Sequence, residues 1–92
     1  MSLKAGQKVK WKARALDPTR FGTVAHVIPA FRSPAQAIPD FFKGWNERLA
    51  VIHFDPDAVR NHETYIVLTE QGIRGGKPHA FRPSVFNLEV ID

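Results

Sequence analysis

Cysteine is absent from this 92-residue chain, and its absence removes several classes of function at once. Without thiols there can be no disulfide, thiolate zinc site, iron–sulfur cluster or cysteine nucleophile. Long apolar runs are missing as well. The longest, residues 49–52 and 65–68, hold four residues each, whereas a membrane-spanning helix needs about 20. The first six residues show no apolar signal-peptide core. We therefore expect a cytoplasmic protein without a membrane span.

The length predicts a single domain over residues 1–92, because two linked domains would each fall below the usual domain size. The charge of that domain is unevenly placed. Residues 1–46 carry eight Lys/Arg against two Asp, and residues 47–92 carry five Lys/Arg against seven Asp/Glu. The net charge of +4 thus divides into +6 and −2. Such an excess bears on anionic partners and solubility rather than on the fold.

Residues 7–14 alternate between apolar and basic side chains, a period of two that is typical of a half-buried strand. Trp11 falls on the apolar face and is expected in the core. The opposite face carries Lys8, Lys10, Lys12 and Arg14. Their spacing of about 6.6–6.8 Å is comparable with that of phosphates two nucleotides apart, so these residues are the candidate site for an anionic partner. The alternative is that they only solvate the outer face of the strand.

Further strands are predicted at residues 23–28, 48–54, 64–69 and 88–91, where β-branched and aromatic residues stand between Gly and Pro turns. Residues 79–82 form one more short stretch of this kind. Residues 83–87 look like a single helical turn that Ser84 caps. Five short strands without a long helix favour a small all-β barrel, whose closure would hide the sheet edges.

Residues 29–47 interrupt this pattern, because prolines recur at positions 29, 34 and 39. Proline blocks both ladder hydrogen bonds and helix interiors, so we expect mostly loop here, with at best a short helix over residues 39–45. Its aromatic residues are too apolar for a solvated linker: Phe31, Phe41, Phe42 and Trp45. Two interpretations stay open. The side chains cap an open end of the core, or they form an exposed patch that binds a partner.

The titratable residues nominate neither a metal site nor a catalytic site. The four histidines, at 26, 53, 62 and 79, show no metal-binding spacing, and Asp55 and Asp57 read as turn chemistry after a strand. His26 and His53 would be neighbours if their two strands paired. No serine has an assignable base, and no carboxylate pair has a catalytic spacing. We therefore predict no cofactor, no metal and no enzyme activity.

Several short segments resemble one group of small barrels. They are residues 6–11 (GQKVKW), 22–24 (GTV), 51–55 (VIHFD), 81–84 (FRPS) and 88–90 (LEV). In this order they are similar to the electron-transport-accessory group of SH3-like barrels. That group includes the ferredoxin-docking subunit of photosystem I, the variable chain of ferredoxin-thioredoxin reductase and the C-terminal domain of the nitrile hydratase β-chain. The resemblance implies a five-stranded SH3-like barrel with a 29–47 insertion, acting as an accessory subunit of a larger enzyme.

Three functional hypotheses follow. The first is a non-enzymatic module that docks an acidic protein partner through the basic strand face, with the aromatic 29–47 segment as a further contact. The second is a nucleic-acid-binding module of bacterial or phage type that uses the same lysines, which exposed aromatic residues beside the lysines would favour. The third is an oligomeric enzyme with a pore site between barrels.

Overall fold

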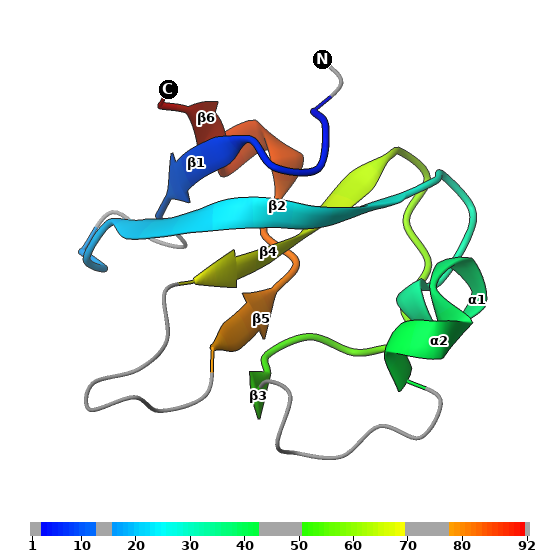
Figure 1. Cartoon of the computed structure of the whole chain (residues 1–92). Helices are drawn as coiled ribbons and strands as arrows, with labels where there is room; N and C mark the ends of the chain where they lie inside the picture. Colours follow the sequence, from blue (N-terminus) through cyan, green and yellow to red (C-terminus); the bar gives the residue numbers. More distant parts are fainter. Residues whose placement is uncertain (1–2, 13–15, 43–50, 70–77, 92) are drawn as a thin grey trace.

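The computed structural model describes residues 3–12, 16–42, 51–69 and 78–91, and of Phe42 only the backbone. Its strands are β1 (Lys8–Trp11), β2 (Arg20–Ile28), β3 (Val51–Ile52), β4 (Thr64–Thr69), β5 (His79–Phe81) and β6 (Glu89–Val90). Two short helices, α1 (Pro34–Ala37) and α2 (Pro39–Phe42), lie together beyond the end of β2 (Figure 1). A single 3-10 turn, η1 (Val85–Asn87), precedes β6. Within these ranges no helix has the length and apolar character needed to cross a bilayer.

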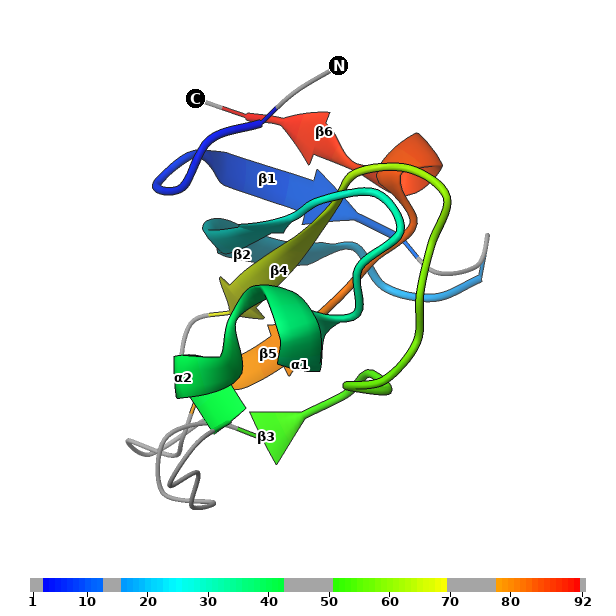
Figure 2. The ribbon, with the colours of Figure 1, turned by 90° about the vertical axis from the view of Figure 1, so that its right-hand side faces the viewer.

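The six strands form one mixed sheet in the order β3-β5-β4-β2-β1-β6. Figure 2 shows its twist, with β1 and β6 at one end and β5 and β3 at the other. The predicted closed barrel of five strands is therefore wrong for the described residues, where β3 and β6 are the two edges of an open sheet. The reason lies in the predicted strand 48–54. Its described part forms only a two-residue strand, which pairs in parallel with β5 and leaves the place beside β2 to β4.

Strand β2 is the longest of the described strands, and two local features allow it to pair with β1 on one side and β4 on the other. Its first part pairs with β1 and its later part with β4, and the register shifts between Val24 and His26, as at a β-bulge. Gly22 lies close against β4. A Cβ atom there would stand 2.6 Å from Val67 Cγ1 and 2.7 Å from the Leu68 carbonyl oxygen, so only glycine fits without a shift of its neighbours.

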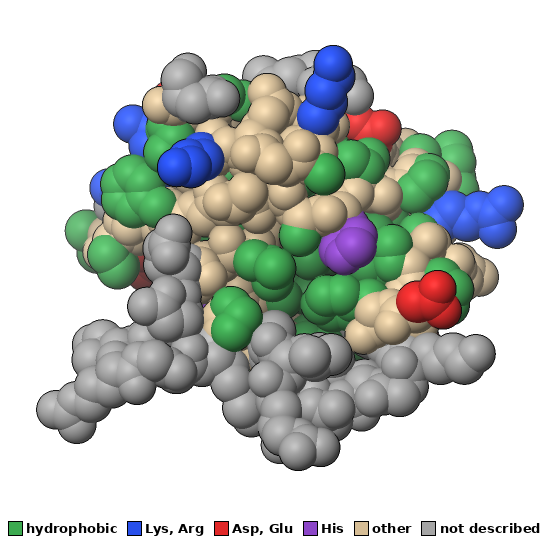
Figure 3. Space-filling view, in the orientation of Figure 1, with side chains coloured by type: hydrophobic (Ala, Val, Ile, Leu, Met, Phe, Trp, Pro, Cys, Tyr) green, Lys and Arg blue, Asp and Glu red, His purple; other side chains and the backbone are tan. Residues whose placement is uncertain are grey.

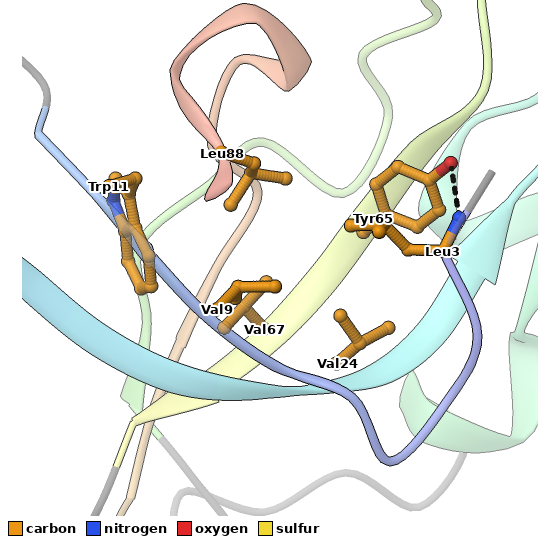
Figure 4. Packing of buried hydrophobic residues seen from close by; sticks show 7 residues of the cluster. All are labelled: Leu3, Val9, Trp11, Val24, Tyr65, Val67 and Leu88. Atoms are coloured by element: carbon orange, nitrogen blue, oxygen red, sulfur yellow. Dashed lines mark hydrogen bonds between the residues drawn. The ribbon is translucent and has the colours of Figure 1, made fainter. Parts of the chain in front are cut away.

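The larger part of the core lies between β1, β2, β4 and the C-terminal segment. It comprises Leu3, Val9, Trp11, Val24, Tyr65, Val67 and Leu88 (Figure 4). Tyr65 also satisfies polar groups: its hydroxyl accepts a hydrogen bond from the Leu3 amide at 3.1 Å and donates one to Glu63 Oε1 at 2.6 Å. The prediction that Trp11 belongs to the core is confirmed, since only 5% of its surface is exposed.

A second, smaller cluster lies on the other face of β4, with Ile28, Ile66 and Ala80 at its centre. Hydrophobic side chains gather around a histidine on the face seen in Figure 3. Helix α1 begins with a capping box, in which Ser33 Oγ accepts from the Gln36 amide and Gln36 Oε1 accepts from the Ser33 amide. The predicted short helix within residues 39–45 is found in part, as α2 over Pro39–Phe42, whereas α1 was not predicted. Pro34 and Pro39 each stand at the first position of a helix, where proline is tolerated because its missing N–H would have no partner within the helix.

Candidate functional site

Strand β1 presents two chemically different faces, as its alternation predicts. Val9 and Trp11 are buried, Lys8 and Lys12 are exposed, and the Lys10 side chain keeps 40% of its surface accessible. The three lysines therefore lie together on the outer side of the strand. The fourth predicted member, Arg14, lies outside the described residues.

The neighbours of β1 determine what surrounds these lysines. Lys10 is the register partner of Phe21 on β2 and of Glu89 on β6, and directly paired residues share one face of a sheet. Phe21 is 55% exposed, so an aromatic ring stands in solvent beside the lysines. We call Lys8, Lys10, Lys12 and Phe21 the basic face. Phe21 itself was missed at the sequence level, because only the register with β1 reveals what it lies beside.

Glu89 opposes the charge of the basic face at one point. Its Oε2 lies 3.9 Å from Lys10 Nζ, with 70% of its side chain exposed. A contact of this length between exposed groups contributes about 0–1 kcal/mol, so it holds Lys10 only weakly. The same two residues, with Trp11, Lys12, Thr19 and Asn87, line a cleft of ≈ 210 Å³ beside β1. The lysines thus border a hollow as well as a flat strand surface.

A group of rings lies next to this cleft and was not predicted from the sequence. His53 stacks on Phe81 with their centroids 4.5 Å apart and the planes at 6°. His53 Nε2 and His79 Nδ1 lie 2.6 Å apart, which places the two imidazoles side by side in hydrogen-bonding contact. Trp11 meets Phe81 edge-on at 5.6 Å, and the Arg20 guanidinium stands 5.0 Å from the Phe81 centroid. We call His53, His79 and Phe81 the ring stack.

Two hollows flank the ring stack and share Phe81. One, of ≈ 270 Å³, is lined by Trp11, His53, Phe81, Arg82, Pro83, Ser84 and Asn87. The other, of ≈ 420 Å³, is lined by Arg20, Phe21, Thr69, His79 and Phe81. Because Phe21 lines the second hollow and also belongs to the basic face, the two features adjoin. Arg20 pairs with Trp11, so Arg20 and the ring stack lie on the face of the sheet opposite the lysines, and Phe21 is the residue that the basic face and the second hollow share.

The ring stack changes the proton affinity of His53. Its neighbours remove water from part of the imidazole, and this desolvation, followed by the charges of His79 and Arg20, lowers the pKa of His53. The residue as a whole stays exposed. In the contact between the two rings one nitrogen donates and the other accepts, and the tautomers of the imidazoles decide which does which.

The expectations for the histidines and for the acidic pair Asp55 and Asp57 have different outcomes. The conditional pairing of His26 with His53 does not occur, because β2 and β3 are not neighbours in the sheet, and His26 instead lies edge-on to Phe41 at 5.5 Å. The turn reading of the acidic pair is confirmed, since Asp55 Oδ1 accepts from the Asp57 amide at 2.9 Å. Among the described residues no group of three or more His, Cys, Asp or Glu could hold a metal ion.

The aromatic residues of the 29–47 segment do not act as one group. Phe41 packs against the second core cluster, as the core-capping interpretation predicts. Phe31 is 72% exposed and adopts a φ of 65°, a conformation that bulky residues rarely take, while its amide donates to the Arg60 carbonyl at 2.7 Å. The Phe42 side chain and Trp45 lie outside what the structure describes. The predicted partner loop is thus divided between core and surface.

No family model, curated protein or solved structure matches the chain. Its function therefore has to be argued from the geometry of the basic face and the ring stack.

Proposed function

We propose that the chain is a non-enzymatic binding module that holds single-stranded nucleic acid on its basic face. The observation that carries this proposal is the position of Phe21, exposed and directly opposite Lys10. Proteins that bind single strands combine cations that follow the phosphates with aromatic rings on which bases stack. A ring can stack on a base only if that base is unpaired, which favours a single strand over a duplex.

The lysines supply the other half of such a site. Lys8, Lys10 and Lys12 repeat along one face at about 6.6–6.8 Å, and the cleft beside β1 continues from Lys10 and Lys12 toward Asn87. Arg20 adds a positive charge to the hollow that Phe21 lines, from the face of the sheet opposite the lysines. These contacts follow the backbone and carry no sequence preference, so we expect binding to depend on charge and strand length.

Titration with a fluorescent single-stranded oligonucleotide over a range of salt concentrations tests this proposal. The logarithm of the affinity should fall linearly with the logarithm of salt concentration, because bound counterions are released. Replacing Lys8, Lys10 and Lys12 by Gln should lower the steepness of that line by about 0.7 per lysine, or about 2 for the triple variant.

Two matched variants make the test specific to the basic face. Arg32→Gln removes one charge from an exposed residue beyond the other end of β2, and it should leave the affinity and the salt slope nearly unchanged. Glu89→Gln removes the opposing charge and should tighten binding by about 2- to 5-fold at low salt. Undetectable binding at about 50 mM salt, or equal losses of affinity in the single variants Lys10→Gln and Arg32→Gln, would contradict the proposal.

An acidic protein partner is the second candidate, as the first hypothesis from the sequence has it. The observation that favours it is apolar: Phe86, Val90 and Ile91 are exposed at and near β6, close to the lysines of β1. Protein interfaces use such aromatic and aliphatic contacts, with charge at the rim. A partner of this kind would compete with the oligonucleotide and would lose affinity in the Phe86→Ser variant. No observation in the described residues favours an oligomeric enzyme.

We further infer that the fold is an opened relative of the SH3-like barrel. The antiparallel succession of β1, β2, β4 and β5 supports this inference, as does the one-turn helix before β6 and the return of β6 to β1. On this reading β3 is an addition at the sheet edge. An accessory role beside a larger enzyme stays a proposal that rests on the resemblance alone.

A further inference from the structure

We propose that the hydrogen-bonded pair His53–His79 is a stacking platform for one unpaired base of the bound strand. The proposal rests on the proposed function, because it assigns a second contact to the same ligand. It concerns the ring stack rather than the lysines, and it predicts that the protein distinguishes a nucleic acid from other polyanions.

The geometry of the pair is that of an extended flat surface. The two imidazoles lie side by side with their planes at 17°, joined by the 2.6 Å contact between Nε2 of His53 and Nδ1 of His79. Both rings run nearly parallel to Phe81, at 6° for His53 and 18° for His79. Phe81 stacks directly on His53, with centroids 4.5 Å apart, while its centroid lies 6.4 Å from that of His79, so Phe81 supports the His53 half of the pair.

The pair keeps contact with solvent. His53 is exposed as a residue although it stacks on Phe81, and His79 is partly exposed. Imidazole rings are among the side chains on which unstacked bases are held. A base laid on the pair would continue an arrangement that already consists of parallel rings.

The surroundings fit the rest of a nucleotide. The ≈ 420 Å³ hollow beside His79 is lined on one side by Arg20, whose guanidinium is positioned to hold a phosphate, and on another by Phe21 of the basic face. The ≈ 270 Å³ hollow, which His53 and Phe81 also line, adds the polar side chains of Ser84 and Asn87 near the ring stack. A strand that runs along the lysines of β1 would pass from one face of the sheet to the other beside Phe21, which lines the hollow next to the platform.

Comparing two polyanions of equal charge tests the platform apart from the lysines. Oligothymidylate offers phosphates and bases, whereas inorganic polyphosphate offers phosphates alone. The native protein should bind the oligonucleotide more tightly. His53→Ala should weaken oligonucleotide binding by roughly 5- to 150-fold, the range found when a base-stacking ring is removed, and leave polyphosphate binding unchanged.

Two control variants distinguish the loss of base stacking from a general effect of replacing a histidine. His53→Phe keeps a flat ring without the hydrogen bond and should retain most of the oligonucleotide affinity. His62→Ala removes a histidine that contacts Phe86 and Asn61 instead, and it should change neither ligand. Circular dichroism confirms that each variant is folded.

The outcomes separate the two proposals. If the oligonucleotide binds more tightly than polyphosphate but His53→Ala alters neither affinity, the platform is wrong while the basic face stands. If both polyanions bind with equal affinity, base stacking on Phe21 and on the platform is overturned together. If neither ligand binds at low salt, the proposed function fails and the platform fails with it. Preferential binding of an acidic protein, with His53→Ala lowering that affinity equally, would also overturn the platform as a base-stacking site.

Discussion

Arg82 is the buried charge of this small core, and its hydrogen bonds tie distant segments together. Only 7% of its surface is exposed. Nε donates to Thr64 Oγ1 at 2.9 Å and Nη1 donates to the Ala58 carbonyl at 2.7 Å, which joins the 55–62 loop to β4. Among the described residues Nη2 has no hydrogen-bond partner. Burial, followed by the charge of Arg60, lowers the pKa of Arg82.

Replacing Arg82 by Ala should therefore reduce the free energy of unfolding by about 2–4 kcal/mol, because it leaves the Ala58 carbonyl and the Thr64 hydroxyl without their donors. Urea denaturation followed by circular dichroism measures the loss. Arg60→Ala is the matched control, since Arg60 is exposed and its removal should change stability by less than about 0.5 kcal/mol. Equal effects of the two substitutions would show that the loop is not held by Arg82.

At the scale of single residues, the sequence predicts which side chains of a strand are exposed and charged better than it predicts which residues of other strands lie beside them. The alternation of residues 7–14 correctly places the lysines of β1 outside and Trp11 inside, because a strand has a period of two whatever it pairs with. It says nothing about Phe21 or the ring stack. Those depend on which strands pair and in what register, and His53 meets His79 only because β3 runs parallel beside β5.

Among the elements, β2 and β4 carry the most specific packing, at Gly22. Gly22→Ala should lower the free energy of unfolding by about 1–3 kcal/mol, since the new methyl group overlaps Val67 Cγ1 and the Leu68 carbonyl oxygen. A double-mutant cycle with Val67→Ala, measured by urea denaturation, isolates the side-chain part of that overlap. Gly22→Ala should cost less in the Val67→Ala background. Strict additivity of the two losses would place the strain elsewhere.

The elements also show where sequence patterns suffice and where they do not. Strand β4 coincides with its prediction at residues 64–69, because its β-branched residues are buried on both faces. The helical turn capped by Ser84 is confirmed, since Ser84 Oγ accepts from the Phe86 amide at 3.4 Å. Helix α1 was missed. Proline blocks a helix interior and so argues against a helix here, whereas the Ser33–Gln36 capping box makes Pro34 the first residue of one.

For the molecule as a whole, β4 links the two parts of the core. Tyr65 and Val67 belong to the larger cluster and Ile66 to the smaller, so the two clusters share one strand. A small domain built in this way should unfold in one cooperative transition. A substitution that destabilises one cluster should then lower the unfolding midpoint that is measured by a probe in the other cluster.

Ile66→Ala tests this cooperativity, because Ile66 is fully buried in the smaller cluster and its truncation should cost about 2–5 kcal/mol. In a Trp45→Phe background Trp11 is the remaining tryptophan, and its fluorescence reports on the larger cluster. Urea unfolding should shift to the same lower midpoint by Trp11 fluorescence and by circular dichroism. An unmoved fluorescence transition beside a shifted dichroism transition would mean that the clusters unfold separately. In that case the ring stack, which lies at the end of β3 and on β5, would lose its packing on β4 while the basic face stays folded. As the urea concentration is raised, binding to oligothymidylate would then be lost at a lower concentration than binding to polyphosphate.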